Sequence, residues 1–199
     1  TIPAISLTSI NLSHNSLSSF PTAIRHCSNL EKLNLSFNRY LADVPESFFG
    51  TFLTKIQQVD LSHCLFSQLP SGDFGKCNFL TFLNCSHNLI HEFSCNFTLQ
   101  PVLAIHSVPS DAAAASSISL GPDFSLDLSY NRLTACSLSF PNATRSIRLN
   151  LSHNRLEQFT CTEQAYSYLH LVKELQLQNN SLRELEEEFL NKLVNCVHL

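Results

Sequence analysis

The segment LEKLNLSFN, residues 30–38, decides how this chain folds. Leu33 and Leu35 alternate with polar residues, which is the two-residue period of a short β-strand with one buried face. Leu30 precedes this strand and Asn38 closes the motif, which therefore has the form LxxLxLxxN. One such unit buries too little apolar surface to offset the entropy of ordering its backbone. The motif is therefore expected to recur.

The motif does recur, at nearly constant spacing along the whole chain. Its closing position is occupied in turn by Asn15, Asn38, Cys64, Asn88, Asn131, Asn154 and Asn180. These positions are 23, 26, 24, 43, 23 and 26 residues apart. Regular repetition of this kind indicates units that stack and bury each other's apolar faces.

The motif resembles that of the leucine-rich-repeat family, and the resemblance covers the chain apart from the region of residues 94–122. It implies an α/β solenoid, a right-handed superhelix of about seven to eight repeats, with a concave parallel β-sheet and an irregular or short-helical convex side. We expect one domain over residues 1–199. The closing Asn side chains should form a ladder that satisfies turn backbone groups, and the family tolerates Cys at the place of Cys64.

The second half of each repeat should form the convex side. Proline at positions 21, 45 and 70 marks a turn after the motif. Phe49 and Phe74 follow as expected core residues, and apolar spacing predicts short helices at 162–171 and 185–194. The glutamates between positions 184 and 188 are interpreted as a solvated face. Residues 94–122, where the spacing doubles, are predicted to be a degenerate repeat or an inserted loop.

The composition and charge of the chain limit the classes of protein to which it can belong. The chain is 44% hydrophobic and 14% charged, with a net charge of −4 and no basic cluster, which argues against nucleic acid as a partner. No apolar run reaches the roughly 18–20 residues that span a bilayer. Met is absent, and Leu199 has the position of the first leucine of another repeat. We therefore expect this chain to be a fragment of a longer protein.

The cysteines and the glycosylation sequons point to different compartments. Most of the eight cysteines occupy repeat positions, which favours reduced core thiols and a cytoplasmic setting. Seven N-x-S/T sequons leave an extracellular location as the alternative. Four of these are the NLS or NCS phrase that the repeat itself generates, whereas Asn96 and Asn142 are predicted to lie in turns.

Catalytic and metal chemistry find little support in the sequence. His14, His63, His87 and His153 precede the ladder position and should form one column, for which solvation or contact with a partner is favoured over metal binding. There is no CxxC pair, no Gly-flanked Ser and no Gly-rich phosphate loop. We expect no enzymatic activity, no metal and no cofactor.

The concave face remains as the expected functional surface. The alternation places polar residues outward there, so the large side chains among them are the candidate anchors for a protein partner. The candidates are Phe37, Asp60, Phe82, Asp127, Tyr130 and Arg148, with the two aspartates giving charge selectivity. Phe37 and Phe82 are expected to be exposed. These features indicate a protein-interaction scaffold within a signalling or adaptor protein. The alternatives are an extracellular receptor ectodomain resembling the Toll-like group, and the targeting arm of a phosphatase or kinase.

Overall fold

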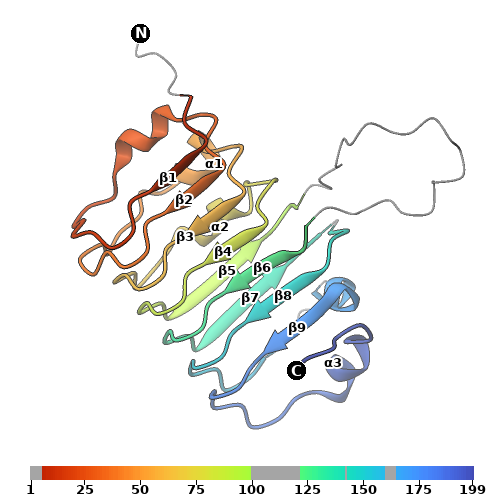
Figure 1. Ribbon diagram of the computed structural model, residues 1–199. Helices are drawn as coiled ribbons and strands as arrows, with labels where there is room; N and C mark the ends of the chain where they lie inside the picture. Colours follow the sequence, from red (N-terminus) through yellow and green to blue (C-terminus); the bar gives the residue numbers. More distant parts are fainter. Residues whose placement is uncertain (1–5, 100–121, 142, 160–164) are drawn as a thin grey trace, which may run out of the picture.

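Short parallel strands, one from each repeat, lie side by side in one sheet (Figure 1). The computed structural model describes residues 6–99, 122–141, 143–159 and 165–199. Within them the main sheet has seven strands: β1 (Ser9–Asn11), β2 (Lys32–Asn34), β3 (Gln58–Asp60), β4 (Phe82–Asn84), β6 (Phe124–Asp127), β8 (Ile147–Asn150) and β9 (Val172–Gln176). This is the expected α/β solenoid with its parallel sheet.

The register of the sheet aligns equivalent positions of successive repeats. Leu33 of β2 pairs with Ile10 of β1 on one side and with Val59 of β3 on the other. The same column continues through Leu83, Leu126, Leu149 and Leu175. From Leu33 onward these side chains are no more than 2% exposed. Because the register keeps every repeat in phase, each outward position also forms a column.

Short helices and a second sheet form the opposite side. The helical segments are η1 (Thr22–His26), α1 (Phe48–Phe52), α2 (Ser71–Phe74), η2 (Ala165–Leu171) and α3 (Glu187–Lys192). Pro21 and Pro70 stand immediately before η1 and α2, as the expected turns require. Phe49 and Phe74 are fully buried, with ring centroids 4.7 Å apart. The helix expected at 162–171 is a 3-10 helix, η2, and residues 160–164 lie outside the described residues.

The doubled spacing between Asn88 and Asn131 does not interrupt the main sheet. β4 pairs directly with β6, so residues 94–122 add no strand between them. On the other side, β5 (Glu92–Asn96) pairs with β7 (Ala135–Ser139) in a parallel two-stranded sheet, which lies behind the main sheet in Figure 1. Residues 100–121, on which the choice between a degenerate repeat and a loop depends, lie outside the described residues.

The closing Asn side chains bind backbone groups of two adjacent coils. Asn131 Nδ2 donates to Leu128 O at 3.0 Å in its own coil and to Cys85 O at 2.9 Å in the preceding one. Its Oδ1 accepts the Ile90 N–H at 3.0 Å. Asn38, Asn88, Asn154 and Asn180 repeat this arrangement. Asn15 is exposed and binds only Leu12 O and Ser13 O, within its own coil.

Cys64 takes the ladder position with weaker contacts. Its Sγ donates to Leu35 O at 3.4 Å and to Ser62 O at 3.5 Å. Burial raises the pKa of this thiol to about 11, and that of Cys77 to about 12. Cys85 is completely buried, and burial raises its pKa as well. These three cysteines are free thiols and stay protonated at neutral pH. No helix within the described residues is both long and apolar enough to cross a membrane.

Candidate binding surface

The residue that ends each of the strands β1, β2, β3, β4, β6 and β8 has a structural role that the sequence did not reveal. Asp60 Oδ1 accepts the Ser62 N–H at 3.0 Å, and Asp127 Oδ1 accepts the Ser129 N–H at 2.8 Å. Asn11, Asn34, Asn84 and Asn150 make the same bond to the residue two positions later. Short Asp and Asn side chains commonly cap turns in this way. Asp60 and Asp127 therefore stabilise turns, in addition to placing negative charge on the concave face.

Phe82 and Arg148 lie in two separate shallow depressions of the concave face. Phe82 is half-buried rather than exposed and lines a depression of about 230 Å³ together with Asp60 and Lys32. Arg148 is exposed and lies beside Asp127 in a second depression of about 220 Å³. Its guanidinium is 2.9 Å from an Asp123 carboxylate oxygen and 3.5 Å from one of Glu174. Arg148 therefore already has acidic neighbours.

Phe37 and Tyr130 belong to a different arrangement at the end of the strands. The residue before each ladder position has a left-handed backbone, with φ between 53° and 57° at His14, Phe37, His63, His87, Tyr130, His153 and Asn179. This conformation costs about 1–2 kcal/mol for a residue with a side chain. A backbone hydrogen bond to the next coil helps to hold it, such as that from the Tyr130 N–H to Ser152 O at 3.1 Å.

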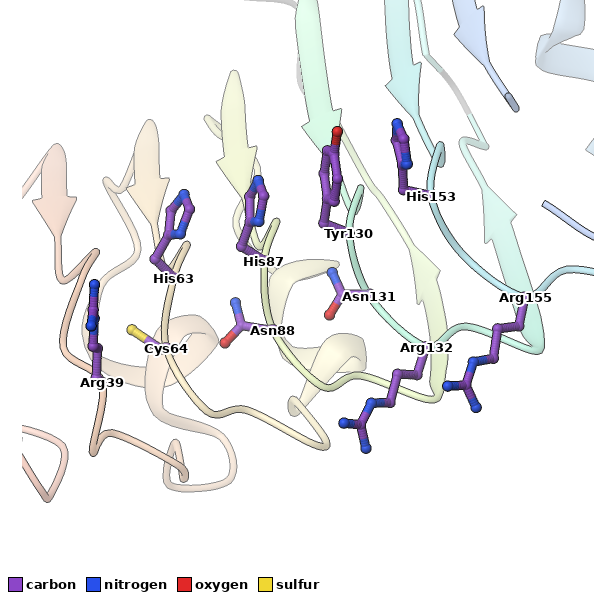
Figure 2. Close-up of a pocket in the computed structure, with 10 residues that line it drawn as sticks. All are labelled: Arg39, His63, Cys64, His87, Asn88, Tyr130, Asn131, Arg132, His153 and Arg155. Atoms are coloured by element: carbon purple, nitrogen blue, oxygen red, sulfur yellow. The ribbon is translucent and has the colours of Figure 1, made fainter. Parts of the chain in front are cut away.

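This repeated turn stacks six rings into a continuous row, which we call the ring ladder: His14, Phe37, His63, His87, Tyr130 and His153. Neighbouring centroids are 4.0–4.2 Å apart, and the ring planes differ by 9–12°. Asn179 Nδ2 lies 3.1 Å from His153 Nε2 and extends the row. Figure 2 shows four of the rings standing face to face. Phe37 is half-buried because both of its faces are covered.

Three arginines missed by the sequence reasoning lie beside the ring ladder. Arg39, Arg132 and Arg155 each follow a ladder Asn and are exposed. They line a shallow groove of about 580 Å³ together with the rings of His63, His87, Tyr130 and His153. In Figure 2 the ladder residues Asn88 and Asn131 lie between the row of rings and the pair Arg132 and Arg155. The recurring Asn-Arg phrase was the available signal.

The stack has one contact between two histidines. His63 and His87 lie with ring centroids 4.1 Å apart, whereas the other histidines stack on Phe37 or Tyr130. Burial lowers the pKa of His63 below its ordinary value of 6.5, and the neighbouring His87 lowers it further. At neutral pH His63 is therefore uncharged, and its ring edge can donate or accept a hydrogen bond.

The groove beside the ring ladder presents hydrogen-bonding groups. Among the described residues, no group of three His, Cys, Asp or Glu side chains lies close enough to hold a metal ion. The groove offers arginine donors, imidazole edges and the Tyr130 hydroxyl. Such groups recognise carboxylates and other hydrogen-bond acceptors.

Comparison with known proteins agrees with this architecture. A family model described as "Leucine rich repeat" matches residues 28–90, and one described as "Leucine Rich repeats (2 copies)" matches residues 5–49. The chain is 28% identical to osteomodulin of Rattus norvegicus over 94% of its length and 43% of that protein. It is 32% identical to the CD180 antigen of Mus musculus over 75% of its length and 24% of that protein.

A third relative is leucine-rich repeat serine/threonine-protein kinase 1 of Mus musculus, 29% identical over 95% of this chain and 10% of the kinase. The chain thus spans less than half the length of each of these relatives. Among solved structures, a leucine-rich-repeat protein of Leptospira interrogans matches with a TM-score of 0.55 and 23% identity, over 98% of this chain and 49% of that one. The TLR13–ssRNA13 complex matches with a TM-score of 0.52 and 22% identity, over 95% of this chain and 27% of that one. At these identities the structures share the fold alone. The recurring motif, the stacked parallel strands and the matching family models together place the chain in the leucine-rich-repeat family.

Proposed function

We propose that this chain is a protein-recognition module that binds a protein partner on its concave face. The observation that carries the proposal is the outer face of the main sheet, over which none of the described helices or strands lies, whereas α1, α2 and the β5–β7 pair lie on the opposite side (Figure 1). Its outward columns are held by backbone pairing between all seven strands, with one register irregularity between β8 and β9. A rigid surface loses little conformational entropy when it binds a partner.

The proposed contact residues are Phe37, Asp60, Phe82, Asp127, Tyr130 and Arg148. Tyr130 is 47% exposed and Phe82 half-buried, and aromatic side chains of this kind contribute most of the binding energy in many interfaces. Asp60, Asp127 and Arg148 would select partners by charge, which affects specificity and association rate more than affinity. We assign no catalytic role to this segment. In a larger enzyme the repeats would act as a targeting arm.

The test compares proteins captured by the wild type and by two variants, using quantitative mass spectrometry. Phe82→Ala with Tyr130→Ala removes two of the three proposed aromatic contacts, leaving Phe37. Phe52→Ala, in α1, is the matched control because Phe52 is 40% exposed on the other side of the sheet. A true partner is captured equally by the wild type and the control. The amount captured by the double variant should be at least about tenfold lower. If no protein shows this pattern while the double variant keeps its melting curve, the concave face is not the binding surface.

Within this proposal we favour a reducing, cytoplasmic setting, since Cys64, Cys77 and Cys85 are buried free thiols. A specific observation favours the alternative of an extracellular receptor: the sequon residue Asn96 is exposed at the end of β5. Asn142 lies outside the described residues. A shift in mass after glycosidase treatment, abolished by Asn96→Gln, would establish the receptor alternative. An unchanged mass supports the cytoplasmic setting.

A further inference from the structure

The groove beside the ring ladder collects positive charge without any acidic side chain. We call it the ring–arginine groove, lined by Arg39, His63, Cys64, His87, Asn88, Tyr130, Asn131, Arg132, His153 and Arg155. Of the described residues, no Asp or Glu lines it. The chain as a whole carries a net charge of −4, so this concentration of arginine is contrary to its overall charge.

The three arginines of the groove are available to a ligand. Arg148 and Arg183 each form an ion pair with a carboxylate of this chain. In contrast, Arg39, Arg132 and Arg155 take part in none of the ion pairs among the described residues. Unpaired guanidinium groups on a rigid groove are suited to carboxylates, which they can bind through two parallel hydrogen bonds.

The ring ladder determines which kind of anion fits. Proteins that bind single-stranded nucleic acid stack its bases on free aromatic faces. Here the faces of His63, His87 and Tyr130 are covered by neighbouring rings at 4.0–4.2 Å, so only ring edges are open to a ligand. Ring edges carry nitrogen and hydroxyl groups that bind carboxylates and peptide groups. These contacts favour a polypeptide over a nucleic acid.

We propose that the ring–arginine groove binds an extended, acidic segment of a protein partner, and that it binds this segment more tightly as the pH falls. The segment would lie along the solenoid, across the ends of β3, β4, β6 and β8, where His63, His87, Tyr130 and His153 stand. The proposal rests on the proposed function, since the partner is a protein, and it adds the chemistry of the partner and a second contact surface.

The pH dependence follows from the groups around His63. Its ring faces contact Phe37 and His87, and its charged or titratable neighbours are His87, Asp60, Arg39 and His14. Burial and His87 oppose its protonation more than Asp60 favours it. A carboxylate in the groove would supply the missing negative charge and raise the pKa of His63. Binding would then take up a proton, so affinity rises as the pH falls. Glutamate, with an ordinary pKa of about 4.3, stays ionised at pH 5.5.

The test measures binding of a fluorescein-labelled peptide of alternating Glu and Gly by fluorescence anisotropy at pH 7.5 and 5.5. A Lys–Gly peptide and a single-stranded RNA of equal length serve as competing probes. Arg132→Gln with Arg155→Gln removes two guanidinium groups, and Arg25→Gln, on η1, is the matched control. His63→Phe with His87→Phe removes the titrating groups but keeps rings in the ladder, as Phe37 does naturally.

The Glu–Gly peptide should bind more tightly at pH 5.5, by about tenfold, and the Lys–Gly peptide should not bind. Loss of two exposed charge contacts, each contributing up to about fivefold, should weaken binding about tenfold in the arginine variant and leave the Arg25 control unchanged. The histidine variant lacks two imidazole edges of the groove, so it should bind more weakly than the wild type at pH 7.5, and the ratio of its affinities at pH 5.5 and pH 7.5 should fall toward one. Tighter binding of RNA than of the acidic peptide, or equal affinities for all variants, overturns the proposal. Phe82 lines a separate depression and not the ring–arginine groove. Capture by Phe82→Ala alone therefore tests the proposed function separately from this outcome, and the proposed function can hold even if the groove does not bind acidic segments.

Discussion

Replacing Asn131 by Ala tests how the ladder stabilises the solenoid. The carbonyls that Asn131 binds keep other donors: Cys85 O retains Asn88 Nδ2, and Leu128 O retains Asn154 Nδ2. The Ile90 N–H is different, because Ile90 is completely buried and Asn131 Oδ1 is its acceptor. An orphaned buried N–H costs about 1–3 kcal/mol, and each shared hydrogen bond lost costs about 0.5 kcal/mol more. The free energy of unfolding should fall by about 3 kcal/mol.

Urea denaturation followed by circular dichroism measures this loss, and the melting temperature should fall by about 6–12 °C. Asn15→Ala is the matched control, because Asn15 is exposed and its amide binds only two carbonyls of its own coil. It should cost less than about 1 kcal/mol. Equal losses for the two variants would refute the reasoning, since the cost would then not depend on bonds between coils.

Three further predictions concern Cys64, His63 and Cys85. Cys64→Asn should raise the free energy of unfolding by about 1 kcal/mol in urea denaturation, because the new amide oxygen can accept the Tyr40 N–H of the preceding turn. A lower free energy of unfolding would contradict this prediction and show that an amide does not fit the site. The pKa of His63 is lowered in the fold, so the unfolded chain takes up its proton first and stability should decrease as the pH falls below 6.5. His63→Phe should reduce this slope between pH 7 and 5, and an unchanged slope contradicts the assignment. Native Cys85 should resist a thiol reagent that labels Cys196, since Cys85 is fully buried with a raised pKa and Cys196 is partly exposed; mass spectrometry of labelled peptides distinguishes the two.

The sequence by itself determined the fold and the columns of the sheet. Alternating apolar residues closed by Asn at regular spacing specify a stacked strand, because a single repeat cannot bury its own apolar face. The same periodicity placed His63, His87 and Tyr130 in one column. It also marked Asn131 and its equivalents as ladder residues, whose bonds the structure describes.

Only the tertiary structure determined which side chains of those columns come into contact and form a groove. Periodicity gives the order of side chains along a strand but not the sign of φ after it, and the left-handed turn is what brings the rings into contact. His87 and Tyr130 stack although they are far apart in sequence, because β4 pairs directly with β6. Arg39 and Arg132 come from distant repeats and share one groove for the same reason. Register between strands is a property of the folded sheet, so a site built across repeats exists only once the coils have stacked.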